Sequence, residues 1–322
     1  MRALYDLPAP AKVNLFLHVI GRRADGYHLL QSVFVLIDWC DTLHFERRSD
    51  TQLQRHDLSA QLPDDDLCLR AARALRQASG VQMGVDISID KQVPWGAGLG
   101  GGSSDAATTL LALNRLWGLN WSREQLLRIA VTLGADVPFF VGGRNAWVEG
   151  IGEQLTPIAW PPLDATEASK ASTHQPCTQW LAVVKPATPI PTSAIFNSSL
   201  LARDTKHAIV SDFLAASNTQ AIEVDTDNKS SSGSAKSFMK FGKNDLQKPA
   251  QAYSNEVSQA LELLSKRFGN SRMTGSGSAV FADAGYGPAP AASMPDSSAL
   301  PAEWVGRMCQ CLSQHPLLEW AN

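Results

Sequence analysis

Apolar residues occur in β-type runs at the start of the chain. Residues 12–20 read KVNLFLHVI and residues 32–39 read SVFVLIDW, with the polar, turn-forming GRRADGYH between them. Such runs flanked by turn residues are typical of β-strands, so we expect two strands joined by a loop. DTLHFERR at 41–48 continues the second strand, and VDISIDKQV at 85–93 alternates as a half-buried strand does.

Helical patterns with start and stop signals come next. DLCLRAARALRQASG at 66–80 has the spacing of an amphipathic helix, and its final glycine suits a C-terminal cap. Ser103 and Ser104 are expected to cap a second helix. Residues 122–125 form a capping-box pattern, Ser followed three positions later by Gln, that predicts a third helix over 123–133.

The second half of the chain continues the mixture of strands and helices. NAWVEGIGEQLTPI at 145–158 predicts a hairpin, and WLAVVKP at 180–186 predicts the strand that opens a second domain. YSNEVSQALELLSKRF at 253–268 predicts an amphipathic helix. RMTGSGSAVFADA at 272–284 predicts a strand, a glycine turn and a strand, and PAEWVGRMCQCLSQ at 301–314 predicts a closing helix.

The length of 322 residues exceeds one typical domain, so two domains or one large α/β unit are expected. We place an N-terminal domain at 1–158 and a C-terminal domain at 180–322. Segments near 163–179 and 218–243 are rich in Ser, Thr, Lys and Asp and poor in large apolar residues. They are interpreted as polar insertions, and no function is assigned to them.

Composition narrows the class of partner. The net charge is −3 and no long Lys/Arg run occurs, which argues against a nucleic acid or an anionic membrane as the main partner. The five cysteines are scattered and include no C-x-x-C pair, as expected for reduced thiols rather than a disulfide or zinc framework. Since the sequence shows neither a signal-peptide pattern nor a bilayer-spanning apolar run, we expect a cytoplasmic protein that acts on a small molecule. The sequence does not give the oligomeric state.

A glycine-rich stretch after the predicted strand at 85–93 carries the strongest chemical signal. A strand, closely spaced glycines and a helix N-terminus bring several backbone N–H groups to one point, which attracts phosphate oxygens. Glycines allow this close approach, and a plain surface turn would need only one or two of them. The expected ATP-binding residues are Pro94, Trp95, Gly96, Ala97, Gly98, Leu99, Gly100, Gly101, Gly102, Ser103 and Ser104.

Two other phosphate-binding motifs compete for this stretch. Gly96, Gly98 and Gly101 satisfy G-x-G-x-x-G, the fingerprint of dinucleotide-binding oxidoreductases. That unit needs a second strand after the loop helix, whereas here another helical pattern follows at 123–133. A Walker-A loop is excluded because Gly102 stands where that motif requires lysine. The cation that assists phosphoryl transfer therefore has to come from elsewhere in the chain.

The loop PWGAGLGGGSSDAA resembles that of the GHMP kinase superfamily, whose pattern is Pro, small residues, Gly-Leu-Gly and Ser-Ser. AKVNLFLHVIGRRADGYHLL at 11–30, ADVPFF at 135–140 and TGSGSAVFA at 274–282 extend the resemblance to both ends of the chain. Only the two polar insertions fall outside it. Trp95 and Ala97 depart from the family, which often has smaller or more flexible residues at these loop positions.

The resemblance implies an α+β (α/β two-layer) fold of two domains with the active site in the cleft between them. It implies an ATP-dependent kinase assisted by Mg²⁺. The motifs as a set are similar to one branch of the superfamily, whose acceptor is the 2-hydroxyl of a cytidine diphosphate ester of methylerythritol, in non-mevalonate isoprenoid biosynthesis. Alternatives are a GHMP kinase acting on mevalonate, homoserine or a sugar, a non-catalytic nucleotide-binding module, and, less favoured, an oxidoreductase.

Two charged residues take the catalytic roles by resemblance, and these are Lys12 and Asp136. A carboxylate within hydrogen-bond reach can accept the proton of the attacking hydroxyl, and an ammonium group stabilises the developing negative charge. The lysine can also keep the carboxyl group ionised. An isolated Lys or Asp is usually a solvated charge, so these roles depend on the motifs around the two residues.

The family's substrate pocket falls on residues from three segments. Tyr27 and His28 line the cytidine pocket by resemblance, and Phe196 faces the tyrosine across the base. Stacking of a base on an aromatic ring is worth about 1–3 kcal/mol. Asn14 and Thr192 are expected to form hydrogen bonds with the substrate. Taken alone, Tyr27 would be a half-buried core aromatic, and His28 is either a polar reader of the base or structural.

A second glycine turn, TGSGSA at 274–279, closes on the phosphate end of the site in GHMP kinases. A tight hairpin explains its glycines equally well, so no catalytic role is assigned to it. Mg²⁺ often binds through substrate phosphates and water with few protein ligands, and no protein ligand is named for it.

Overall fold

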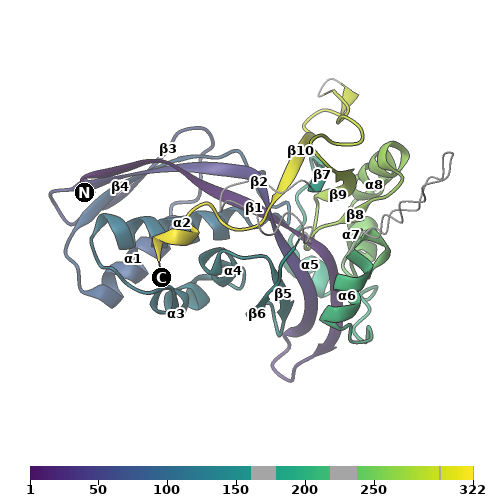
Figure 1. The fold of residues 1–322 in the computed structure, drawn as a ribbon, viewed down its shortest axis with the longest axis horizontal. Helices are drawn as coiled ribbons and strands as arrows, with labels where there is room; N and C mark the ends of the chain where they lie inside the picture. Colours follow the sequence, from purple (N-terminus) through teal and green to yellow (C-terminus); the bar gives the residue numbers. More distant parts are fainter. Residues whose placement is uncertain (161–178, 218–237, 297–298, 322) are drawn as a thin grey trace, which may run out of the picture.

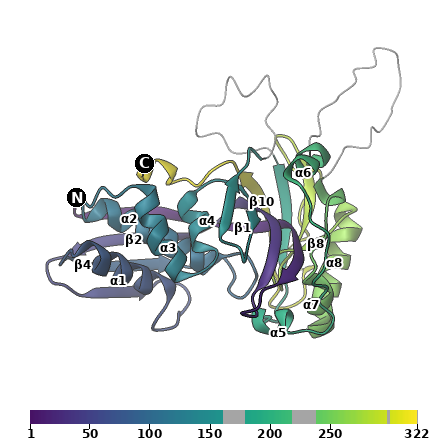
Figure 2. The ribbon, with the colours of Figure 1, turned by 90° about the horizontal axis from the view of Figure 1, so that it is seen from below.

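The computed structural model describes residues 1–160, 179–217, 238–296 and 299–321 (Figures 1 and 2). The predicted polar insertions fall mostly outside these ranges, and only Gln179 and residues 238–243 of them are described. None of the helices in the described ranges is long and apolar enough to cross a membrane.

Two long antiparallel strands, β1 (Ala3–Arg22) and β2 (His28–Arg48), run through both halves of the molecule (Figure 1). They confirm the predicted strand pair. Their central residues are buried on both faces, which explains why the sequence is a nearly continuous apolar run instead of a clean alternation. Lys12 pairs with Leu36 and Asn14 with Phe34, so both polar residues lie in the middle of this ribbon.

One sheet continues from the N-terminal half into the C-terminal half, in the order β3-β4-β2-β10-β7-β9-β8. Strands β1 and β5 also pair with β2, and β6 pairs with β5. The remaining strands are β3 (Leu53–Asp57), β4 (Gly84–Asp90), β5 (Ala146–Glu149), β6 (Gln154–Pro157), β7 (Gln179–Lys185), β8 (Arg272–Met273), β9 (Val280–Tyr286) and β10 (Val305–Leu312). The predicted hairpin at 145–158 and the strands at 180–186 and 272–284 are confirmed.

Helices cover the sheet in two groups. In the N-terminal half, α1–α4 lie on one side of the strands, and in the C-terminal half α7 and α8 pack beside β7–β9 (Figures 1 and 2). The helices are α1 (Leu67–Ser79), α2 (Gly101–Leu116), α3 (Arg123–Leu133), α4 (Val137–Gly142), α5 (Thr192–Phe196), α6 (Val210–Ser217), α7 (Gln247–Tyr253) and α8 (Asn255–Phe268), with short 3₁₀ turns η1 (Phe238–Lys240) and η3 (Leu318–Trp320).

The helix ends follow the sequence signals in two of three cases. Gly80 ends α1 in the left-handed conformation, with φ 72°. Ser122 and Gln125 form the expected capping box of α3. The predicted caps of α2 are wrong, because Gly100 is the N-cap and Ser103 and Ser104 lie inside the first turn. Within the described residues, the start of α2 has no side-chain cap, and no group accepts a hydrogen bond from the N–H of Gly101, Gly102 or Ser103.

The predicted closing helix at 301–314 is wrong. The segment forms strand β10, which pairs with β7 over most of its length and with β2 at Cys311 and Leu312. Cys309 and Cys311 are both fully buried at alternating positions. The pattern of a short apolar segment is compatible with a helix or a strand. Here hydrogen bonding to β7 and β2 stabilises the strand.

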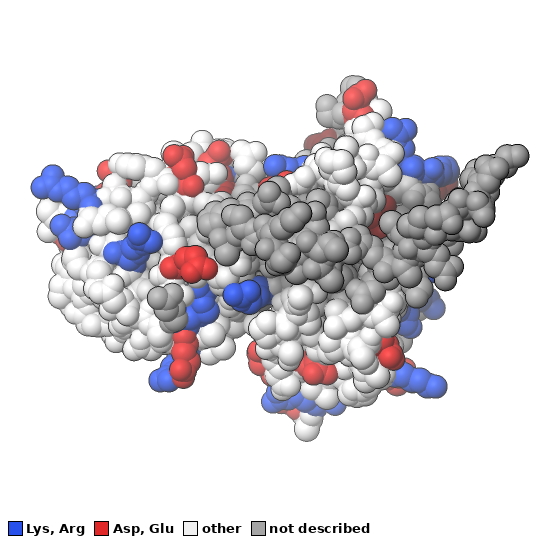
Figure 3. All heavy atoms as spheres, in the orientation of Figure 1, with Lys and Arg blue, Asp and Glu red and all other residues white. Residues whose placement is uncertain are grey.

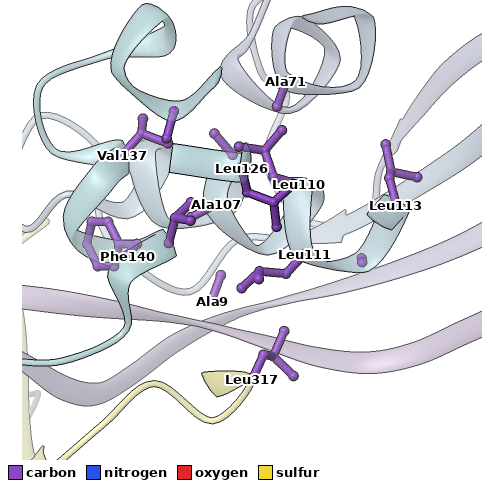
Figure 4. Packing of buried hydrophobic residues seen from close by; sticks show 14 of the residues in the cluster. Ala9, Ala71, Ala107, Leu110, Leu111, Leu113, Leu126, Val137, Phe140 and Leu317 are labelled. Atoms are coloured by element: carbon purple, nitrogen blue, oxygen red, sulfur yellow. The ribbon is translucent and has the colours of Figure 1, made fainter. Parts of the chain in front are cut away.

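Three hydrophobic clusters form the core, and β1 contributes to each through Ala9, Val13 and Val19. In the N-terminal cluster, Leu110 and Leu111 of α2 pack among side chains from other helices and from β1 (Figure 4). Leu317 joins this cluster from the end of the chain, so the C-terminal segment returns to the N-terminal half. The proposed domains 1–158 and 180–322 are thus joined by shared strands and by this return.

Charged side chains are spread over the face shown in Figure 3, where Lys and Arg alternate with Asp and Glu. This mixed pattern agrees with the small net charge of −3.

Candidate active site

Lys12 and Asp136 meet although 124 positions separate them in the sequence. Lys12 lies in the middle of β1 and is 3% exposed, and Asp136 directly precedes α4 with 32% of its side chain exposed. Lys12 Nζ is 3.6 Å from Asp136 Oδ2. Burial lowers the pKa of Lys12, and the charge of Asp136 opposes that shift. The arrangement is a buried ammonium group beside a carboxylate that solvent or a ligand can reach.

The ammonium group is held by further contacts. Lys12 Nζ donates to Asn14 Oδ1 at 2.6 Å and lies 4.5 Å from the centroid of the Phe34 ring. Asn14 is itself fixed, because its Nδ2 donates to Ser32 Oγ at 2.9 Å and its backbone N–H donates to Thr274 Oγ1 at 2.8 Å. Asn14 therefore orients Lys12, and its own side-chain amide is engaged with protein groups.

The glycine loop packs directly on Lys12. The Lys12 backbone N–H donates to the Leu99 carbonyl at 2.9 Å. A Cβ on Gly100 would lie 3.2 Å from Lys12 Cγ and 3.0 Å from the Phe140 ring, and Gly100 has φ 73°. Only glycine fits there without displacing the lysine or α4. The N-terminus of α2 thus starts beside the Lys12–Asp136 pair.

The second glycine turn lies against the first. A Cβ on Gly98 would be 2.7 Å from the Thr274 carbonyl oxygen, and a Cβ on Gly275 would be 2.8 Å from the Gly98 carbonyl oxygen. The Ala279 N–H donates to the Ala97 carbonyl at 3.1 Å. The two glycine segments are consequently interlocked backbone to backbone, although about 180 residues lie between them.

Side chains of the loop face in different directions. Ala97 and Leu99 are buried, so only their backbone can face a ligand. Trp95 is 73% exposed, and Pro94 precedes it at the start of the loop. Gly101 and Gly102 form the beginning of α2. The loop therefore offers backbone groups and the open helix start, as phosphate binding requires.

Two buried hydroxyl groups near this point have no hydrogen-bond partner within the described residues. They are Ser104 Oγ, in the first turn of α2, and Ser278 Oγ, in the second glycine turn. A buried polar group without a partner is costly, and phosphate oxygens would supply acceptors for both. The residues present therefore fit the triphosphate of ATP.

The protein offers fewer groups that could bind a metal ion than groups that could bind phosphate. The described part of the chain holds no group of three or more His, Cys, Asp or Glu side chains that could bind a metal. Asp136 supplies one accessible carboxylate near the start of α2. A site with few protein ligands suits Mg²⁺ carried on ATP phosphates.

The predicted pocket residues are partly brought together. The rings of His28 and Phe196 have centroids 5.1 Å apart at an angle of 32°, and His28 is 8% exposed. Tyr27 is 60% exposed at the end of the β1–β2 turn, directly before β2, and its ring is not packed on Phe196. Thr192 begins α5, and its Oγ1 is 2.9 Å from Ser276 Oγ. Helix α5 therefore connects the contact between the His28 and Phe196 rings with the second glycine turn.

The sequence interpretation missed a buried ion network at the start of the glycine loop. Lys91 Nζ contacts Asp41 Oδ2 and lies 2.6 Å from Asp105 Oδ2. Asp41 Oδ1 also accepts from the backbone N–H groups of Gln92 and Val93. Burial raises the pKa of Asp105 against the attraction of Lys91, while the two carboxylates outweigh burial and raise the pKa of Lys91. No local pattern signals this network, because Lys91 looks like ordinary strand polarity and its partners lie 50 and 14 positions away in the sequence.

The sequences of known proteins align with this chain over its full length. The GHMP kinases N terminal domain matches residues 66–144. A 4-diphosphocytidyl-2-C-methyl-D-erythritol kinase of Methylibium petroleiphilum is 61% identical over 322 residues, covering 100% of this chain and 99% of the relative. The kinase of the same name from Verminephrobacter eiseniae is 53% identical, with 100% and 99% covered.

Solved structures agree with these relatives. A crystal structure of 4-(cytidine 5'-diphospho)-2C-methyl-D-erythritol kinase superposes with a TM-score of 0.69 at 30% identity, covering 95% of this chain and 99% of that one. A mevalonate kinase structure superposes with a TM-score of 0.61 at 12% identity, covering 97% and 100%. The second likeness shows a common fold alone.

Proposed function

Because the chain belongs to the 4-diphosphocytidyl-2-C-methyl-D-erythritol kinase family of GHMP kinases, we propose that it transfers the γ-phosphoryl group of ATP to the 2-hydroxyl of 4-diphosphocytidyl-2-C-methyl-D-erythritol. The products are the 2-phosphate and ADP. Within the site, the main support for the proposal is the Lys12–Asp136 pair. The two charged groups lie 3.6 Å apart beside the open start of α2.

The glycine loop and α2 bind the triphosphate in this mechanism. Backbone N–H groups from the loop and the helix start face the phosphate oxygens, and Ser104 and Ser278 supply hydroxyl groups. Mg²⁺, when bound with ATP, neutralises charge on the phosphates, and Asp136 is the accessible carboxylate that can contribute to holding it.

Asp136 and Lys12 act on the acceptor and on the transferred group. The acceptor oxygen forms a bond to the γ-phosphorus while the bond to the bridging β–γ oxygen breaks, and the hydroxyl proton passes to Asp136. The transition state of such transfers is loose, so orienting the tertiary hydroxyl matters as much as removing its proton. Lys12 stabilises the negative charge on the transferring oxygens, and Asn14 keeps the ammonium group aimed.

The cytidine end of the substrate occupies the pocket of His28 and Phe196. Phe196 offers one ring face to the base, and Tyr27 covers the base from the solvent side of the β1–β2 turn. Thr192, at the start of α5, binds the diphosphate bridge between the base and the reacting hydroxyl. The cytidine pocket thereby anchors a part of the substrate that does not react, which positions the 2-hydroxyl at Asp136.

The other functions considered from the sequence are less well supported. In place of the strand that an oxidoreductase needs, α2 is followed by α3. Homoserine and mevalonate kinase structures resemble the chain at 12–15% identity, which concerns the fold and not the acceptor.

The proposal is tested by supplying purified protein with ATP, Mg²⁺ and one acceptor at a time. The acceptors are 4-diphosphocytidyl-2-C-methyl-D-erythritol, mevalonate, homoserine and galactose at equal concentrations, and ADP release and product mass are measured. We expect transfer to the cytidyl compound alone. Transfer to another acceptor would overturn the pocket assignment, and transfer to none would overturn the activity.

A further inference from the structure

Arg203, in the loop between α5 and α6, contacts both aromatic residues of the predicted cytidine pocket, His28 and Phe196. Its Nε donates to Nε2 of His28 at 3.0 Å. Its Nη2 donates to the carbonyl oxygens of Phe196 at 3.1 Å and of Ser198 at 3.0 Å, and its Nη1 donates to the Leu201 carbonyl at 3.1 Å. One guanidinium group thus holds the histidine from β2 and the end of the helix that carries Phe196.

The contact fixes the tautomer of His28. A guanidinium group stays protonated and offers only donors, so Nε2 of His28 has to accept with its lone pair. The proton of the neutral ring then lies on Nδ1. Burial lowers the pKa of His28, and the positive charges of Arg203 and Arg22 lower it further, which keeps the ring neutral. Within the described residues the His28 ring bonds only through Nε2, so its Nδ1–H is left as a donor for a ligand.

The loop that carries Arg203 is pinned to the β1–β2 ribbon beyond this contact. The Thr205 N–H donates to the Val19 carbonyl at 3.1 Å, and the Ala208 N–H donates to Gln31 Oε1 at 2.9 Å. Gln31 in turn donates to Glu149 Oε1 at 2.7 Å. These contacts fix the backbone of the loop that carries Arg203. The guanidinium group is therefore held next to His28.

We propose that Arg203 is a positioning residue that sets the base preference of the pocket, by holding His28 as the Nδ1–H tautomer against Phe196. A pyrimidine beside this donor has to offer an acceptor. Oxygen O2 accepts in both cytosine and uracil, so the discrimination has to come from position 3. Cytosine N3 accepts from the His28 donor, whereas uracil N3–H would face it donor to donor and leave both groups unpaired. The inference rests on the proposed function, because it assumes that the pocket takes the cytidine end of the substrate.

The kinetic test compares Arg203→Met with the control Arg22→Met. Arg22 pairs with His28 across the β1–β2 ribbon and carries a positive charge near the ring, but it makes no hydrogen bond to it. For Arg203→Met we expect the KM of the cytidyl substrate to rise about tenfold, because a His28 ring that is no longer held in one tautomer loses its oriented hydrogen bond to the base, with KM for ATP and kcat within about twofold. We also expect the preference of kcat/KM for the cytidyl substrate over its uridyl analogue to fall by about tenfold. Arg22→Met should leave that preference unchanged.

The tautomer is measured in the unmutated chain by ¹⁵N NMR of histidine-labelled protein, with the His28 signals identified by their loss in His28→Asn. We expect an unprotonated Nε2 and a protonated Nδ1, and a change in this pattern in Arg203→Met but not in Arg22→Met. A protonated Nε2 in the unmutated chain would overturn the inference, as would an unchanged base preference in a folded Arg203→Met variant. Failure of the unmutated enzyme to phosphorylate the cytidyl substrate would instead overturn the proposed function, and the NMR result would still stand for the ring.

Discussion

The phosphate end of the candidate site is formed mainly by backbone groups, and the base end mainly by side chains. At the phosphate end, two glycine turns interlock through backbone atoms, and Ala97 and Leu99 between the glycines are buried. At the base end, the contacts are made by side chains on a turn and a short helix, and Tyr27 is mostly exposed. Backbone groups recognise phosphate in any nucleotide, whereas side chains can tell one base or acceptor from another. The phosphate end should therefore tolerate little change, and the base end should determine specificity.

The largest effect is expected where the two ends meet. Asp136→Asn keeps the shape of the side chain but removes the proton acceptor, and we expect kcat to fall by about 10²–10⁴-fold. ADP affinity, measured by calorimetry without Mg²⁺, should stay within about twofold, because the glycine loop and the start of α2 are unchanged. Full turnover in a folded variant would remove Asp136 from the mechanism.

The buried ions at the phosphate end come next. Lys91→Met leaves Asp41 and Asp105 buried without their cation, and we expect a loss of about 3–5 kcal/mol in the free energy of unfolding. Asp105→Asn is the matched control, since its amide oxygen still accepts from Lys91 and burial already opposes the charge of this carboxyl group. Urea unfolding of both variants measures the difference. Equal losses would show that Lys91 is not what holds the start of the loop.

Gly98→Ala tests the interlocked turns. The new Cβ would lie 2.7 Å from the Thr274 carbonyl oxygen, with φ 74° at this position. Strain and overpacking together should cost about 2–4 kcal/mol and weaken ADP binding. Gly118→Ala provides the comparison, because Gly118 has φ 68° but open space around its Cβ. If the two variants lose equal stability, the backbone contact between the turns contributes nothing.

A smaller and more selective effect is expected at the base end. Phe196→Ala removes one ring face, and we expect a weakening of cytidyl-substrate binding by about 1–3 kcal/mol, seen as a rise in KM. KM for ATP should be unchanged. Tyr253→Ala, which removes an exposed aromatic ring elsewhere, serves as the control. A parallel rise in KM for ATP would contradict the separation of the two ends.

The same contrast explains what the sequence could predict. Local sequence patterns predict the strand pair, the α3 capping box and the glycine loop, and the structure contains all three. Strand β10 was missed because its neighbours β2 and β7, and not its own spacing, determine its conformation.

Long-range polar contacts were the hardest to foresee. Lys91 and Arg203 look like solvated charges in the sequence, yet each reaches partners far along the chain, such as Asp41 and His28. Nothing in the local pattern around either residue indicates a partner. The Lys12–Asp136 pairing was expected only through resemblance to a family, and the fold supplies the proximity of the two residues.

The most direct test of the central claim is a crystal structure of the protein with a non-hydrolysable ATP analogue and 4-diphosphocytidyl-2-C-methyl-D-erythritol. The account predicts the acceptor 2-hydroxyl oxygen at about 2.6–3.2 Å from the Asp136 carboxylate, with the γ-phosphate at the start of α2 and the cytosine between Tyr27 and Phe196. A complex in which the hydroxyl lies beyond the reach of Asp136, or in which the cytosine binds away from His28 and Phe196, would contradict it.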